Sequence, residues 1–142
     1  AQLGSDCPFF VYDSACHATG RGEILQPYAC DLSNYKIALV HPGIHVSTAW
    51  AFSQLQPHAK AKSIAEIVAQ PIEEWKTTLI NDFEAPIFLA HPVLEEIKNE
   101  LYTNGAIYAS MSGSGSSLFG IFPNNFIWPN KFMNNQFRVD FI

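Results

Sequence analysis

Residues 105–122 read GAIYASMSGSGSSLFGIF, and this stretch decides the fold. Two apolar runs, Ala106–Met111 and Leu118–Phe122, flank a segment of glycine and serine, Ser112–Ser117. Short runs of aromatic and β-branched residues favour strands, whereas glycine and serine favour the connections between them. The stretch therefore predicts two strands joined by a loop, here called the glycine loop (Ser112–Ser117).

Helical patterns precede this hairpin. The clearest covers Val93–Tyr102, which follows Pro92 and ends at Asn104-Gly105, a pair suited to a left-handed C-cap. Shorter helices are expected over Thr48–Leu55, where Ser47 offers an N-cap hydroxyl, and over Ile64–Ala69 and Glu73–Phe83.

Strands are expected on both sides of this helical region. The expected strands are Phe9–Tyr12, an irregular Ser14–Leu25, Tyr35–Val40 and a final Phe137–Ile142, with an irregular Pro123–Asn135 before the last. Early strands, central helices and late strands predict an α+β layered sandwich, organised as one domain over residues 1–142.

Composition limits the partners. The chain has 142 residues, is 48% hydrophobic and only 15% charged, which is below the usual quarter and suggests that another surface covers part of it. Its net charge is −5, and its eight Lys and Arg form no basic stripe, so nucleic-acid binding is not expected. A bound phosphate would need backbone N–H groups, Mg²⁺ or residues outside the chain to balance its charge.

The cysteines and hydropathy indicate the compartment. Three cysteines without a Cys-x-x-Cys pair do not suggest a disulfide framework, so a reducing cytoplasm is expected. The chain contains no apolar run of about 18 residues and no signal pattern, so no membrane association is expected. It begins at Ala1 without a Met, which we interpret as a processing or cloning boundary.

The glycine loop is the first candidate site. Its glycines allow close backbone approach and successive inward N–H groups, an arrangement suited to anions, and its serines add small donors. The Rossmann pattern fails because Leu118 replaces the third glycine, and the nucleophile-elbow pattern fails because Gly115 replaces serine. Composition alone supports a plain hairpin turn equally well.

Asp6 is the second candidate, within the stretch Leu3–Phe10 (LGSDCPFF). A carboxylate there can act as a general base if a substrate hydroxyl lies within hydrogen-bonding reach. The pattern by itself favours the more common role, in which Asp caps a turn.

The segment around residues 41–48 is the third candidate. His41 and His45 are four residues apart, but the intervening Pro42-Gly43 excludes a zinc-binding helix, so no metal site is predicted. Thr48 stands where it can contact a ligand or serve a helix cap. The polar residues of Asn81–Glu84 (NDFE) more often cap or brace helices than bind substrate.

Taken in order, several segments resemble one family, the GHMP superfamily of small-molecule kinases. The resemblance is to its methylerythritol branch, which phosphorylates the 2-hydroxyl of a cytidine diphosphate-linked methylerythritol in non-mevalonate isoprenoid (terpenoid) biosynthesis. It extends to about Phe122. The matching segments are LGSDCPFF (3–10), ATGRGEIL (18–25), HPGIHVSTAWAF (41–52), NDFE (81–84) and GAIYASMSGSGSSLFGIF (105–122).

The resemblance assigns roles residue by residue. Asp6 matches the catalytic aspartate, the proposed base, which reverses the capping interpretation. Thr48 matches a substrate-binding position near the methylerythritol end. The superfamily's third motif, near the transferred phosphate, corresponds to Ser112, Gly113, Ser114, Gly115 and Ser116. The implied fold is the ferredoxin-like two-layer α+β sandwich of the GHMP kinase C-terminal domain.

The family's nucleotide-binding loop, Pro-x-x-x-Gly-Leu-Gly-x-Ser-Ser, has no counterpart here, nor has its N-terminal lysine. The resemblance therefore implies a C-terminal fragment of a transferase, with ATP and Mg²⁺ bound mainly by a missing N-terminal domain. A general base contributes about 3–5 kcal/mol and positioning about 7–11 kcal/mol, so we expect no kinase turnover from this chain alone.

Three further expectations follow. The missing domain would be a partner, and the apolar surface left by its absence favours self-association. A stand-alone ferredoxin-like module that binds a small ligand without catalysis is the alternative from another class. A sister GHMP kinase acting on mevalonate or homoserine is a third hypothesis, which LGSDCPFF and HPGIHVST disfavour.

Overall fold

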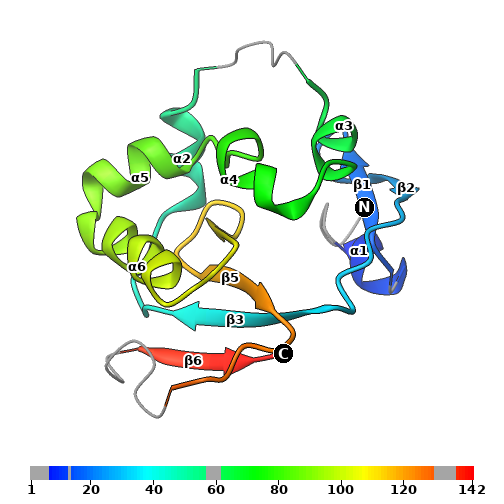
Figure 1. Ribbon diagram of the computed structural model, residues 1–142. Coiled ribbons are helices and arrows are strands. Elements are labelled where there is room, and N and C mark those ends of the chain that lie inside the picture. The colour runs from blue at the N-terminus through cyan, green and yellow to red at the C-terminus, as the bar shows by residue number, and fades with distance from the viewer. Residues whose placement is uncertain (1–6, 13, 57–61, 130–136) are drawn as a thin grey trace. The chain divides into compact units, whose positions relative to one another are not determined.

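The computed structural model of the protein describes residues 7–12, 14–56, 62–129 and 137–142 (Figure 1). The chain divides into two compact units, Ala1–Asp31 and Leu32–Ile142. Asp6 lies outside the described residues.

The described part of the first unit contains one helix and one hairpin. Helix α1 covers Cys7–Tyr12, and strands β1 (Cys16–Thr19) and β2 (Ile24–Pro27) pair antiparallel. The prediction of a strand at Phe9–Tyr12 is therefore wrong. Aromatic and β-branched residues favour strands only where a pleated sheet gives them something to pack against, and Phe10 and Val11 are exposed here. Pro8 in the first turn instead suits a helix.

The irregular strand predicted over Ser14–Leu25 is this hairpin, interrupted by a turn. Gly20 and Gly22 have φ of 70° and 100°, left-handed values that glycine adopts readily. The Glu23 carboxylate accepts a hydrogen bond from Arg21 N at 2.6 Å. Hydrogen bonds from the backbone N–H groups of Glu23 itself and of Arg21 hold the pKa of this carboxyl below its usual value.

The second unit is built on one antiparallel sheet of four strands in the order β4-β5-β3-β6. The strands are β3 (Tyr35–His41), β4 (Tyr108–Met111), β5 (Leu118–Pro123) and β6 (Arg138–Phe141). Strands β3 and β4 run in the same direction with β5 between them, which is the split βαβ arrangement of ferredoxin-like folds. The predicted α+β, ferredoxin-like two-layer class is confirmed.

The helices of the second unit all lie between β3 and β4 in the chain. They are α2 (Thr48–Ser53), α3 (Ile64–Val68), the 3₁₀ turn η1 (Ile72–Glu74), α4 (Trp75–Thr78), α5 (Glu84–Ala90) and α6 (Pro92–Thr103). The Ser47 side chain caps α2 as predicted, by accepting a hydrogen bond from Trp50 N at 3.3 Å. The left-handed Gly105, at φ 101°, follows the end of α6 as predicted.

The helix predicted over Glu73–Phe83 is shorter than expected. It ends at Thr78, because Leu79 leaves the helical region at ψ 84° and its carbonyl accepts the Tyr108 hydroxyl at 2.8 Å. Burial raises the pKa of Tyr108 to about 12. Helix α5 was not predicted. It tolerates Pro86 because that residue lies in its first turn, where no intrahelical N–H bond is lost.

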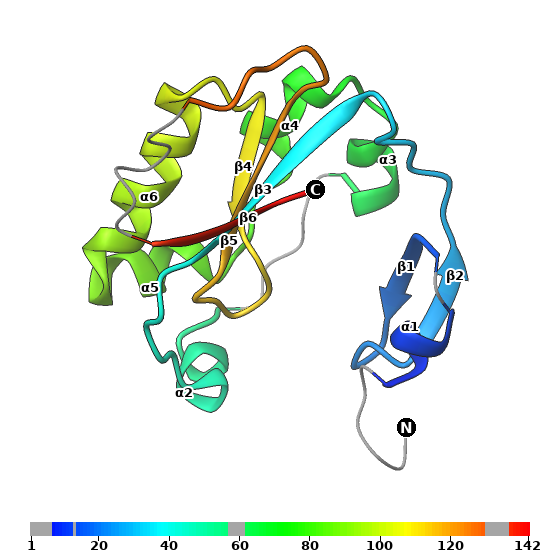
Figure 2. The same ribbon diagram turned by 90° about the horizontal axis from the view of Figure 1, so that it is seen from below.

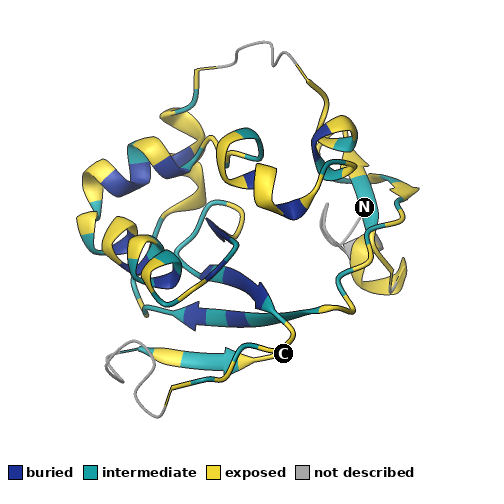
Figure 3. Cartoon of the chain, in the orientation of Figure 1, coloured by how far each residue is buried: buried dark blue, intermediate teal, exposed yellow. Residues whose placement is uncertain are grey.

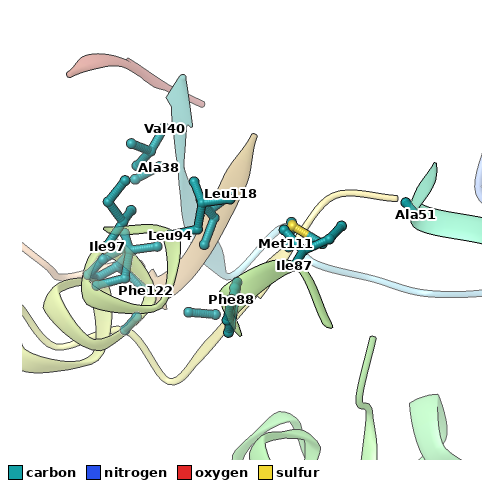
Figure 4. Packing of buried hydrophobic residues seen from close by; sticks show 13 residues of the cluster. Ala38, Val40, Ala51, Ile87, Phe88, Leu94, Ile97, Met111, Leu118 and Phe122 are labelled. Carbon is teal, nitrogen blue, oxygen red and sulfur yellow. The ribbon is translucent and has the colours of Figure 1, made fainter. Parts of the chain in front are cut away.

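The core lies between α5, α6 and one face of the sheet. Figure 2 shows α5 and α6 side by side along the sheet, and α6 packs on β4 and β5. At Gly120 an added Cβ would come within 3.0 Å of Leu101, so glycine lets α6 approach β5 closely. Figure 4 shows part of this core, with the labelled side chains Ala38, Val40, Ala51, Ile87, Phe88, Leu94, Ile97, Met111, Leu118 and Phe122.

Candidate functional site

The glycine loop connects β4 to β5 in a tight, defined conformation. Gly113 and Gly115 have φ of 55° and 84°. Residues with a side chain rarely adopt such φ angles, and a Cβ at Gly115 would lie 2.7 Å from the Met111 sulfur. Ser112 N donates to Ser117 O at 2.8 Å, and Gly115 N donates to Ser112 O at 3.0 Å. These bonds close the turn between the paired strands β4 and β5.

Other loop donors stay open. The backbone N–H groups of Gly113, Ser114 and Ser116 have no hydrogen-bond acceptor among the residues that the structure describes. Gly113 is exposed and the two serines are half-buried. Open N–H groups on a loop with left-handed residues are a general means of binding anions.

A side-chain amide holds the first half of the loop, Ser112–Ser114. Asn81 Nδ2 donates to Met111 O and to Gly113 O, both at 2.8 Å. Its Oδ1 accepts a hydrogen bond from Phe83 N at 3.0 Å, just before α5 begins. The amide therefore joins the start of α5 to the loop.

A buried ion pair holds the strand that enters the loop. The Glu84 side chain accepts hydrogen bonds from Ser110 Oγ at 3.0 Å and from Met111 N at 2.8 Å. Its other oxygen pairs with Lys98 Nζ at 2.6 Å, and the residue is only 6% exposed. A carboxylate this deeply buried needs these partners, since an unpaired buried charge is strongly unfavourable.

The second half of the loop is held by the segment that follows β3. Ser116 Oγ donates to Ile44 O. Ser117 Oγ lies 3.3 Å from His41 Nδ1, and His41 Nε2 lies 3.0 Å from an Asp140 oxygen on β6. The glycine loop is therefore fixed at both ends, by residues far from it in the sequence.

Thr48 also meets the loop. Its Oγ1 lies 3.3 Å from Ser114 Oγ, which brings together two predicted site residues that are 66 positions apart. Ser47, and not Thr48, supplies the helix cap, and Thr48 is exposed. Asp6 lies outside the described residues, so its role as the catalytic base stays a prediction.

The sequence pattern missed the residues that hold the loop. NDFE suggested bracing of a helix, and Asn81 does precede α5, but nothing local indicated that its amide bonds the loop. The partnership of Glu84 with Lys98 and that of His41 with Asp140 join separate elements, so no short-range spacing encodes them.

A pocket of about 530 Å³ between α2, α5 and α6 is a poor phosphate site. It is lined by the acidic residues Asp82, Glu84 and Glu95, whereas its one lysine, Lys98, is already paired with Glu84. Within the described ranges, no three His, Cys, Asp or Glu side chains converge as metal ligands. None of the described helices has the length and apolarity needed to cross a bilayer.

Comparison with known proteins places this site in a family. Residues 58–126, which include α3 to β5 and the glycine loop, match the family model described as GHMP kinases C terminal. This match confirms the resemblance to GHMP kinases seen in the sequence.

The matched relatives carry one name. The chain is 52% identical over 122 residues to 4-diphosphocytidyl-2-C-methyl-D-erythritol kinase of Bacteroides fragilis, covering 86% of this chain and 44% of the relative. It is 43% identical over 138 residues to the kinase of that name from Cytophaga hutchinsonii, covering 96% of this chain and 50% of the relative.

A solved structure agrees. A crystal structure of 4-(cytidine 5'-diphospho)-2C-methyl-D-erythritol kinase aligns with a TM-score of 0.67 and 29% identity, covering 84% of this chain and 45% of that one. The chain thus spans about half the length of the curated relatives it matches.

Proposed function

We propose that this chain is the C-terminal, substrate-side part of an ATP-dependent kinase that phosphorylates the 2-hydroxyl of 4-diphosphocytidyl-2-C-methyl-D-erythritol. The observation that carries the proposal is the glycine loop, which has open N–H groups at Gly113, Ser114 and Ser116. Its Ser114 hydroxyl lies 3.3 Å from the Thr48 hydroxyl. The name shared by the matched relatives supports the substrate. The enzyme is proposed to act in the cytoplasm, in non-mevalonate isoprenoid biosynthesis.

The loop suits the phosphates of ATP for an electrostatic reason. The chain carries a net charge of −5, so fixed backbone dipoles must offset the phosphate charge where no lysine is at hand. ATP, when bound, supplies the phosphoryl group that is transferred. The described residues offer no ligand set for Mg²⁺, so the proposal assigns Mg²⁺ to residues outside them.

Asp6 is the proposed general base. The substrate 2-hydroxyl oxygen forms a bond to the γ-phosphorus, the bond from that phosphorus to the β–γ bridging oxygen breaks, and ADP leaves. Asp6 takes the hydroxyl proton in the same step. Thr48 would hold the methylerythritol end of the substrate next to Ser114.

Under this proposal, kinase activity requires the whole protein. A general base supplies about 10²–10⁴-fold of the rate, whereas positioning of ATP against the hydroxyl supplies about 7–11 kcal/mol. The apolar surface of α1, where Phe10 is 79% and Val11 is 85% exposed, fits a partner segment, which we propose is the nucleotide-binding half. Without that half, the chain is expected to self-associate.

The test joins the chain to the segment that the relatives carry ahead of it. The joined protein should release ADP only when the cytidine-linked substrate is present, and the chain alone should show no turnover. Asp6→Asn should lower kcat by about 10²–10⁴-fold, while Asp31→Asn, an exposed carboxylate in the same unit, should leave it unchanged. Turnover by the chain alone, or full activity of Asp6→Asn, would refute the proposal.

A ligand-binding module without catalysis is the second candidate, because the described fold forms a complete small sheet with its own core. Binding of the substrate by a joined protein that never releases ADP would favour it.

A further inference from the structure

We infer that Asn81 is a positioning residue for phosphate binding, which aims the Ser114 N–H out of the glycine loop by holding the Gly113 carbonyl. This inference rests on the proposed function of the loop.

Both ends of the Asn81 amide form hydrogen bonds, and the partners fix its orientation. Two carbonyl oxygens, those of Met111 and Gly113, face one end of the amide at 2.8 Å, and only the NH₂ group can donate to them. The Phe83 N–H faces the other end at 3.0 Å, where only the amide oxygen can accept. The side chain therefore has one arrangement, and both of its N–H donors are committed to the loop.

Holding the Gly113 carbonyl also sets the next N–H group. The Gly113–Ser114 peptide is trans and planar, so its C=O and N–H point in opposite directions. With the Gly113 oxygen turned toward Asn81, the Ser114 N–H points away from Asn81. That N–H is one of the open donors of the loop, and its residue is the one beside Thr48.

Without Asn81, this peptide would be the least restrained part of the loop. Met111 N stays tied to Glu84, and Ser116 Oγ stays tied to Ile44 O. Gly113 has no Cβ to restrict rotation, and space is open around it, since a Cβ there would meet nothing within 4 Å. A flipped peptide would present a carbonyl oxygen, which repels an anion, in place of a donor.

A purely structural role for Asn81 is separable from this one. Its oxygen bonds Phe83 N ahead of α5, whereas its nitrogen bonds the loop. Asn81→Asp keeps an oxygen for Phe83 N but places a second oxygen against the two carbonyls. Asn81→Ser keeps a hydroxyl that can accept from the nearby backbone and adds no charge, but it is too short to reach the loop.

The experiment follows the loop amides by ¹⁵N–¹H NMR while the whole chain is titrated with inorganic pyrophosphate. In the wild type, the Gly113, Ser114 and Ser116 signals should shift. In both Asn81 variants, binding should weaken by about tenfold, the effect of one lost donor to a charged group. Asn99→Asp, which adds the same charge at an exposed position on α6, should bind as the wild type does.

The outcomes separate the two proposals. If the wild-type loop does not respond, the phosphate-binding role proposed for the loop fails. If the wild type responds and both Asn81 variants bind equally well while their other signals keep the wild-type pattern, the role of Asn81 is overturned and that of the loop stands. If Asn81→Asp does not fold, Asn81→Ser decides alone. In the joined kinase, Asn81→Ser should raise KM for ATP more than it lowers kcat.

Discussion

The two units of the molecule differ in how they bury apolar side chains. Every described residue that is buried belongs to the second unit, Leu32–Ile142, whereas the described part of Ala1–Asp31 has no buried residue (Figure 3). In the first unit Phe9, Phe10, Val11 and Ile24 are 47–85% exposed. The hydrophobic core of the described residues therefore lies in the second unit, while the first exposes apolar side chains of the kind that a partner covers.

The residues of the proposed site are likewise divided between the two units. The glycine loop and Thr48 belong to the second unit, where bonds to Asn81 and to Ile44 O hold the loop, whereas Asp6, the proposed base, belongs to the first.

The largest effect should come from truncating an aromatic side chain in the core. Phe122→Ala removes a fully buried ring and should lower the free energy of unfolding by about 3–5 kcal/mol. Phe10→Ala, the same change in the first unit, should alter it by less than about 0.5 kcal/mol. Denaturant unfolding of both variants compares the units directly, and equal losses would contradict the comparison.

Breaking the ion pair behind the loop should have the next largest effect. Lys98→Met leaves the Glu84 carboxylate buried without its cation and should cost about 2–4 kcal/mol. Glu84→Gln should cost less, because the freed Lys98, 22% exposed in its side chain, can turn toward water. The two variants are compared by thermal unfolding, and a greater loss in Glu84→Gln would show that the buried charge is not the dominant factor.

A methyl group at Gly115 should strain the loop. Gly115→Ala combines a φ of 84° with a contact to Met111, and should cost about 2–3 kcal/mol. The control is Gly43→Ala, where φ is 71° but a Cβ would meet nothing within 4 Å, so that only about 1 kcal/mol is expected. Similar melting temperatures for the two variants would mean that the loop accommodates the added methyl group without further loss of stability.

The smallest expected effect on stability distinguishes Ser47, which caps α2, from the neighbouring Thr48. Ser47→Ala removes the hydroxyl that accepts from Trp50 N and should lower stability by about 1 kcal/mol. Thr48→Ala should change stability by less than about 0.5 kcal/mol but raise KM for the substrate in the joined kinase. A stability loss at Thr48 as large as that at Ser47 would assign Thr48 to the cap instead.

Local signals explain what the sequence predicted well. The hairpin of residues 105–122, the Ser47 cap and the Pro92-to-Gly105 limits of α6 each depend on neighbouring residues, and each is present. The strand predicted at Phe9–Tyr12 was wrong because side-chain type favours a strand only where a sheet receives it. Helix α5 was missed although NDFE, just ahead of it, was noticed as a segment that could cap or brace a helix.

The site was predictable only in part, for a physical reason. Glycine spacing identified the loop, and the family resemblance added Thr48. The two bonds from Asn81 to the loop join residues that are 30 and 32 positions apart in the sequence, and the bond from Ser116 to Ile44 joins residues 72 positions apart. No local sequence pattern indicates pairs so far apart. These bonds depend on the sheet order, which places α5 and the end of β3 at the loop.

The most direct test of the account is a crystal structure of the joined protein with the substrate and a non-hydrolysable ATP analogue. The account predicts terminal phosphate oxygens within about 3.2 Å of the Ser114 and Ser116 N–H groups. It also predicts an Asp6 oxygen at hydrogen-bonding distance from the substrate 2-hydroxyl. Phosphates held elsewhere, or an Asp6 carboxylate remote from that hydroxyl, would contradict it.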